Sequence, residues 1–234
     1  MNTRISRRMI LAAAGALALP RAARAAAVPR SFDHVQLACN DLDKGIAFVE
    51  SRTGVKAASG GVHPGRASRN ALLKLGERRY LEILAPDPAQ DRSLDVRGLY
   101  KIDSPRLLEW VAHVDDLDPL IRALAGAHIE TKPIFPGSRK RPDGKLLRWR
   151  ALNLKDNRGG LLPFFIEWSA DSMHPSKDAP ARCRLEYFEI MSADPEELSS
   201  TFKRMGLDLP VERSDKARLR ALISGPKGDL RLST

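Results

Sequence analysis

Cysteine, aromatic side chains and dense blocks of one charge are all scarce in this sequence. Its 234 residues include two cysteines, Cys39 and Cys183, which are too few for a disulfide-stabilised scaffold. Both lie in apolar, strand-like runs, so we expect two buried thiols, or one disulfide if the fold brings them together. Hydrophobic residues still make up 43% of the chain, which excludes disorder for its bulk and supplies a core for one large or two small domains.

The net charge of +10 does not indicate a nucleic-acid-binding protein. Five of the 39 basic residues lie within the first 25 positions, where no acidic residue occurs. The rest of the chain has 34 basic and 29 acidic residues, a net charge of +5 that is spread along its length without aromatic interleaving. General electrostatics account for that balance, and we expect no nucleic-acid partner.

The N-terminus has the pattern of an export signal. Consecutive arginines at positions 7 and 8 precede an apolar run from Met9 to Leu19, and Ala23 and Ala25 are the small residues that a signal peptidase recognises. This resembles a twin-arginine signal peptide over residues 1–25. The apolar run is shorter than the about 20 residues that span a bilayer, so we expect no stable membrane insertion. We expect twin-arginine export machinery as a partner, a periplasmic or secreted location, and a mature chain from near Ala26.

Two parts of the mature chain repeat one pattern of elements. His34 to Asp43 alternates like a half-buried strand and continues into a helical pattern, and Glu109 to Asp118 does the same 75 residues later. Further along, Tyr80-Leu81-Glu82 matches Phe165-Ile166-Glu167, so the offset has grown to 85 through loop insertions. Each copy is predicted to contain a strand, a helix and three more strands.

A third, partial copy is predicted at the end of the chain. Arg184 to Met191 is strand-like, Asp194 and Pro195 begin a helix, and two strands are expected on either side of Gly225. We predict a paired domain over residues 30–171, a Pro-rich charged linker over 172–181, and a partial βαβ-type module over 182–234 that packs on the paired domain.

This arrangement resembles the vicinal oxygen chelate superfamily, which includes glyoxalase I and extradiol dioxygenases, and more narrowly the glyoxalase-like domain family. The resemblance runs from about Phe32 to Leu232 and implies an α+β fold in which tandem βαβββ modules form a curved mixed sheet around a cleft. The motifs that carry it include Asp33-His34-Val35, Gly61-Val62-His63-Pro64-Gly65, Tyr80-Leu81-Glu82 and Arg141-Pro142-Asp143-Gly144.

The resemblance also implies a divalent metal, held by residues from the first and last strand of each module. The matching positions are His34, Glu82, Glu109 and Glu167; the superfamily more often has histidine where this chain has Glu109. One imidazole with carboxylates suits Mn, Fe(II), Zn or Ni, and Mg is possible. Glu167 or Glu82, released from the metal, would be the base that takes a proton next to a carbonyl.

Five polar or aromatic residues are predicted to contact the substrate: His63, Asn70, His113, Arg148 and Trp149. His63 lies on a loop rich in glycine and proline, where functional residues are common. Arg148 would clamp a carboxylate while Trp149 covers an apolar portion, although a half-exposed strand explains the same residues. His113 lies four residues beyond Glu109 and could take its place at the metal.

Two classes of function follow. The first is a metal-dependent lyase, isomerase or dioxygenase that acts on a small oxygenated molecule. The alternative is a metal-free protein of the same fold that binds or sequesters a small molecule. A glutathione hemithioacetal is not expected as the substrate, because its thiol is chiefly cytoplasmic and this chain is predicted to be exported.

Overall fold

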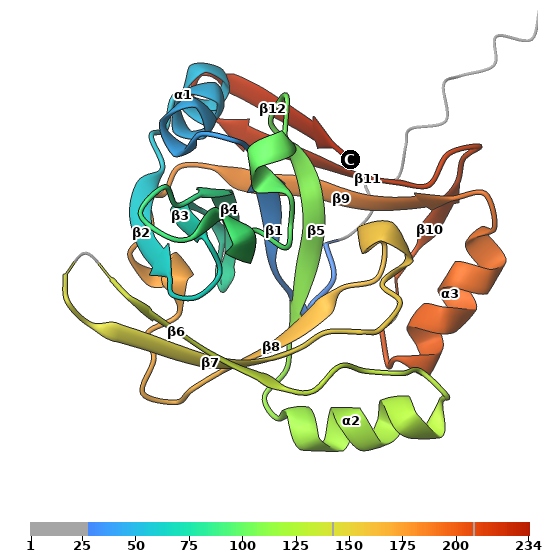
Figure 1. The fold of residues 1–234 in the computed structure, drawn as a ribbon. Coiled ribbons are helices and arrows are strands. Elements are labelled where there is room, and N and C mark those ends of the chain that lie inside the picture. The colour runs from blue at the N-terminus through green and yellow to red at the C-terminus, as the bar shows by residue number, and fades with distance from the viewer. Residues whose placement is uncertain (1–27, 142, 208) are drawn as a thin grey trace, which may run out of the picture.

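The computed structural model describes residues 28–141, 143–207 and 209–234, so the predicted export signal lies outside the described residues. The described chain forms a curved sheet of eight strands and a second sheet of four strands (Figure 1). None of its described helices is long and apolar enough to cross a membrane.

Two βαβββ modules form the large sheet. The first consists of β1 (Phe32–Ala38), α1 (Leu42–Thr53), β2 (Ala58–His63), β3 (Ser68–Gly76) and β4 (Arg79–Pro86). The second consists of β5 (Arg106–His113), α2 (Leu117–Gly126), β6 (Phe135–Lys140), β7 (Leu146–Leu152) and β8 (Phe164–Trp168). Both modules have the predicted order of elements.

The two modules join through their first strands. The strand order is β2-β3-β4-β1-β5-β8-β7-β6, with β1 antiparallel to β5 and each first strand parallel to the last strand of its own module. The edge strands β2 and β6 approach each other so closely that a Cβ on Gly61 would lie 2.5 Å from the carbonyl oxygen of Lys140. The sheet is therefore curved and nearly closed, which confirms the predicted α+β fold around a central cleft.

Aspartates begin the helices, as the sequence predicts. Asp41 accepts a hydrogen bond from the amide of Lys44 at the start of α1, and Asp116 caps α2 in the same way. Gly54 ends α1 with a left-handed backbone (φ 75°), a conformation that costs glycine little. These local signals fix where each helix leaves the sheet.

The C-terminal part contains the predicted strand, helix and two strands, and one further strand, β10, that the sequence does not predict. It consists of β9 (Arg184–Ser192), α3 (Pro195–Arg204), β10 (Val211–Arg213), β11 (Arg218–Gly225) and β12 (Gly228–Ser233), with the order β10-β9-β11-β12. Here the strand directly after the helix, β10, lies parallel to the first strand, whereas the last strand does so in the two modules. This part is a βαβ unit with an added hairpin and does not copy the βαβββ pairing.

An aromatic cluster joins the two sheets. Trp110 on β5 has no exposed surface and packs against Phe32, Phe188 and Phe202, which come from β1, β9 and α3. Its indole N–H donates to the carbonyl of Leu161. The face of the large sheet opposite the cleft is thus covered by the C-terminal part.

The two cysteines do not pair. Cys39 and Cys183 are both buried free thiols, which is the first of the two predicted alternatives.

Candidate functional site

The concave face of the large sheet lines a cleft with about 950 Å³ of atom-free space, including its open mouth. The second module contributes aromatic side chains to its wall: Phe135, Trp149, Phe164 and Trp168 from β6, β7 and β8. Phe164, Ile166 and Trp168 all line it because alternate residues of a strand face the same side. A concave site that combines apolar and aromatic side chains with a few polar groups is typical of a site for a small molecule.

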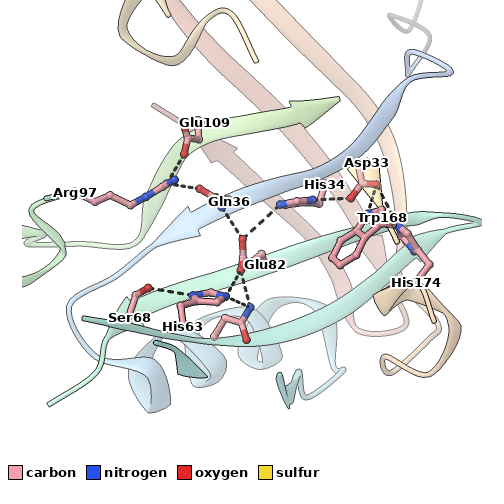
Figure 2. Close-up of polar contacts among 11 residues, drawn as sticks. Asp33, His34, Gln36, His63, Ser68, Glu82, Arg97, Glu109, Trp168 and His174 are labelled. Carbon is pink, nitrogen blue, oxygen red and sulfur yellow. Dashed lines mark hydrogen bonds and ion pairs between the residues drawn. The ribbon is translucent and has the colours of Figure 1, made fainter. Parts of the chain in front are cut away.

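Glu82 lies at the polar centre of the cleft, and its carboxylate is bound on both sides (Figure 2). Oε2 accepts a hydrogen bond of 2.6 Å from the Gln36 amide, and Oε1 accepts one of 2.5 Å from the Asn70 amide. The Nε2 atoms of His34 and His63 lie 3.5 and 3.6 Å from the same two oxygens. Within the described residues, no lysine or arginine contacts this carboxylate.

Asp33 holds His34 in place from the opposite side (Figure 2). Its buried carboxylate lies 2.7 Å from Nδ1 of His34, accepts a hydrogen bond of 3.0 Å from Trp168 Nε1, and lies 3.1 Å from His174 Nε2. The pairing of β1 with β5 shifts register between Phe32 and His34. This irregularity allows Asp33 and His34 to join one network although they are neighbours on a strand.

Burial and pairing give the two cleft histidines opposite charge preferences. Burial opposes protonation of His34, but Asp33 and Glu82 outweigh it and raise the His34 pKa to about 9. Burial likewise opposes ionisation of both carboxyls, yet hydrogen bonding with His34, and with His174 for Asp33, holds their pKa values below the usual range. Burial lowers the pKa of His63 to about 4. At neutral pH the centre therefore holds two carboxylates, one imidazolium and one neutral imidazole.

These shifts predict a stability maximum near neutral pH. Between the ordinary His34 pKa of 6.5 and its raised value of about 9, the folded protein keeps a proton that the unfolded chain has released, so the free energy of unfolding falls as pH rises. The slope is expected to be at most about 1.4 kcal/mol per pH unit. Below pH 6.5 stability falls again, because the unfolded chain protonates His63 while the folded protein resists it down to about pH 4.

Urea unfolding between pH 6 and 9 measures the alkaline limb. The His34→Gln variant is the control, since it should lose that slope. A wild-type stability that stays constant from pH 6.5 to 9 would contradict the charge assignment.

The structure divides the nine predicted site residues into two groups. Those that line the cleft are His34, His63, Asn70, Glu82 and Trp149. Those that do not are Glu109, His113, Arg148 and Glu167.

Glu109 is neutralised beside the cleft. It forms a close ion pair with Arg97, and the same guanidinium donates a hydrogen bond of 2.7 Å to the Gln36 side chain that binds Glu82 (Figure 2). Arg97 and Gln36 thus separate the two predicted ligands Glu82 and Glu109. The carboxylate of Glu109 is engaged by a cation in place of a metal.

The prediction that Glu167 enters the site as ligand or base is not supported, because Glu167 points to the other face of β8. Its neighbours Ile166 and Trp168 line the cleft, so alternation places Glu167 outside. There it forms an ion pair with Arg150, with 2.5 Å between Oε2 and Nη2, and accepts a hydrogen bond from the amide of Leu117 at the start of α2.

Glu167 was predicted to face the cleft because the predicted repeat aligns the last strands of the two modules in the wrong register. Gln36 pairs with Glu82 on β4, and the corresponding central residue of the second module, Val111, pairs with Phe164 on β8. The offset between the last strands is therefore 82 and not 85, and the position of Glu82 corresponds to Phe164.

Arg148 and His113 also lie outside the cleft. Arg148 is exposed and forms an ion pair of 2.9 Å with Asp171, because its neighbour Trp149 takes the inward position on β7. His113 lies at the end of β5 with a buried Nδ1 that has no hydrogen-bond partner among the described residues. Neither side chain is placed to contact a ligand that packs against Trp149 in the cleft.

The donor set does not fit the four-ligand metal centre that the resemblance implies. Of the four residues, only His34 and Glu82 face the cleft, while Glu109 and Glu167 are bound by arginines. In the described part of the chain, no group of three or more His, Cys, Asp or Glu side chains is arranged to hold a metal ion.

The sequence analysis did not predict five residues that line the cleft or one buried residue that supports it. The five are Gln36, Arg66, Arg97, Arg139 and Trp168, and the buried residue is Asp33, which contacts His34 and Trp168. Two of them left a usable signal. Asp33 directly precedes His34, and a carboxylate beside a histidine often orients its ring. Arg139 lies two residues from Gly137 on one strand face, so both point inward. Arg97 comes from the connection between modules, where no periodic pattern indicates which way a side chain points.

Comparison with known proteins supports the fold. The glyoxalase-like domain matches residues 32–206. A hypothetical protein from Staphylococcus aureus is 17% identical, with a TM-score of 0.61 over 86% of this chain and 84% of that chain. Methylmalonyl-CoA epimerase from Mycobacterium tuberculosis is 19% identical, with a TM-score of 0.43 over 60% of this chain and 87% of that chain. Comparison with proteins of curated function found no match.

The family match covers most of the described chain, and its two modules have the strand order on which the sequence resemblance rests. The Staphylococcus aureus structure is too distant in sequence to transfer an activity, so it supports the fold alone. The chain belongs to the glyoxalase-like domain family of the vicinal oxygen chelate superfamily.

Proposed function

We propose that the cleft binds a small organic molecule without the four-ligand metal centre, the second of the two functions considered from the sequence. The observation that carries this proposal is the combination of an aromatic wall with one buried polar centre at Glu82. Two of the four implied metal ligands are engaged by arginines instead, which disfavours the metal-dependent alternative.

Tryptophan fluorescence offers a direct test, because Trp149 and Trp168 line the cleft whereas Trp110 is buried elsewhere. We expect titration with small organic acids, aldehydes and phenols to identify compounds that change the emission and raise the melting temperature. Trp149→Phe should remove much of the fluorescence change for those compounds and reduce the rise in melting temperature only in part, because phenylalanine keeps an aromatic face in the cleft. If no compound alters either signal, the binding proposal is wrong.

Proton transfer is a second candidate function. Of the two predicted bases, only Glu82 lines the cleft, where it could take a proton from a carbon next to a carbonyl and return it. The lowered pKa of Glu82 makes it a weak base, so this function ranks second. Glu82→Gln should then abolish hydrogen–deuterium exchange into a bound compound and leave its binding within a few-fold.

We also propose that the chain is exported by the twin-arginine route, from the paired arginines and the apolar run that follows them. Replacing Arg7 and Arg8 together by lysine is expected to retain the full-length precursor in the cytoplasm. Cell fractionation and the mass of the exported form measure this. Export of the double variant at the wild-type level would contradict the proposal.

A further inference from the structure

Arg139 on β6 is a buried cation for which the described part of the chain provides no ion-pair partner. Its side chain is 3% exposed and lines the cleft, yet it makes no hydrogen bond or ion pair with another described residue. Other arginines near the cleft are engaged: Arg97 binds Glu109, and Arg141 on the same hairpin binds Asp143 and Asp178. Tyr80 and Glu82 act on this charge electrostatically, but neither forms a hydrogen bond or an ion pair with it. Burying a charge without a directly bonded partner is costly, so this position favours a ligand anion that contacts the guanidinium.

The space for that anion is the cleft itself, which Arg139 lines. At Gly60 the packing around Arg139 is tight, because a Cβ there would lie 3.1 Å from Nη1 of Arg139 and 2.2 Å from Oδ1 of Asn70. Glycine at this position therefore allows the guanidinium to lie where it does.

A second cation lies nearer the mouth. Arg66 lines the cleft, and its guanidinium carbon lies 3.7 Å from the centroid of the Phe135 ring, which is 36% exposed. Within the described residues Arg66 has no carboxylate partner. A cation stacked on an aromatic ring at the entrance can attract an anion toward Arg139.

The cleft has positive charge that the described protein does not pair. Arg97 forms an ion pair with Glu109, whereas Arg66 and Arg139 form none with a described residue. An anionic ligand would offset this charge.

From these observations we propose that Arg139 is the anchor for the carboxylate of a small organic acid whose apolar part packs against Trp149. The guanidinium offers parallel N–H donors that match the two oxygens of a carboxylate. This inference rests on the proposed binding function and adds the chemical class of the ligand.

The test uses the full mature chain and matched pairs of compounds. Benzoate, phenylacetate and phenylpyruvate are each titrated beside the corresponding neutral amide, and phenyl phosphate and inorganic phosphate are added as separate arms. Trp149 emission and the melting temperature report binding. We expect the carboxylates to bind, and Arg139→Met to raise their Kd by about 10-fold or more while the affinity for the amides stays unchanged.

The melting temperature of the ligand-free variants shows whether Arg139 has a binding role or a structural one. Because Arg139 has no partner in the described protein, Arg139→Met should leave the melting temperature of the ligand-free protein unchanged or raise it. Arg139→Lys keeps the charge and should retain part of the carboxylate affinity. The matched control is Arg148→Met, on the outer side of the same hairpin, which should not alter carboxylate binding.

Failure of the carboxylate inference and failure of the proposed binding function give different results. Amides that bind as well as the carboxylates, or an Arg139→Met variant with unchanged carboxylate affinity, would overturn the inference and leave the binding function standing. Tighter binding of either phosphate compound would overturn the choice of a carboxylate. If none of the compounds changes Trp149 emission or the melting temperature, the inference and the binding function both fail. A melting temperature that falls sharply in Arg139→Met would assign the residue a structural role.

Discussion

Replacing Asp33 with alanine is expected to lower the free energy of unfolding by about 3–5 kcal/mol, the usual cost of removing one partner from a buried ion pair. Asp33 has no exposed surface and its two oxygens contact His34, Trp168 and His174. The alanine variant leaves a buried imidazolium and an indole N–H without their acceptor. Urea unfolding at pH 7 measures the loss.

Two further variants identify the source of that loss. Asp33→Asn retains the shape and one oxygen, so it should destabilise less than alanine while lowering the pKa of His34, which NMR titration reports. Asp171→Ala removes an exposed carboxylate from its ion pair with Arg148 and should change stability little. A loss of less than about 1 kcal/mol for Asp33→Ala would show that the network does not depend on this carboxylate.

Trp110→Ala is expected to lower the free energy of unfolding by a similar amount, about 3–5 kcal/mol, because it leaves a cavity where the two sheets pack together. The indole is fully buried among Phe32, Phe188 and Phe202. Removing it also leaves the carbonyl of Leu161 without its donor. Chemical denaturation measures the change in unfolding free energy.

Trp168→Phe is the matched control, because Trp168 is a partly exposed cleft residue that loses one hydrogen bond to Asp33 but keeps most of its contact area. Its cost should be clearly smaller than that of Trp110→Ala. Equal losses for the two variants would mean that the C-terminal part does not depend on the aromatic cluster.

The sequence predicts the elements of this fold well because their signals are local. Two-residue alternation marks the strands, and Asp41, Asp116 and Asp194 each cap a helix by accepting hydrogen bonds from its first free amides. The repeat offset of 75 between the first strands also agrees with the pairing of β1 and β5, where Gln36 lies opposite Glu109 and His34 opposite Val111. The fold class can therefore be predicted from local sequence patterns and from the similarity between the two repeats.

The register of β8 could not be predicted in the same way. The run from Leu161 to Trp168 is almost continuously apolar, so matching Glu167 with Glu82 was one of several possible alignments. The choice depends on the loop before it, in which Gly160 has φ 94° and passes so close to β5 that a Cβ would lie 2.7 Å from the carbonyl oxygen of Leu108. Such a contact is a tertiary property without a sequence signature.

The contacts between side chains that are far apart in the chain are the second feature that the sequence does not predict. The resemblance places Glu109 at a ligand position, but only the structure brings Arg97 to it from the connection between modules. On β7 the alternation alone should have excluded a joint role for Arg148 and Trp149, since adjacent strand residues face opposite sides. The sequence thus predicts His34 and Glu82, which line the cleft, but not the arginines that line it beside them.

A crystal structure of the complex with the tightest-binding carboxylate would test the central claim most directly. We predict that the carboxylate oxygens lie within hydrogen-bond distance of the Arg139 guanidinium, that the apolar part contacts Trp149, and that the ion pair between His34 and Glu82 is unchanged. A ligand bound outside the cleft, or a metal ion held jointly by His34 and Glu82 with the carboxylate on it, would contradict the account.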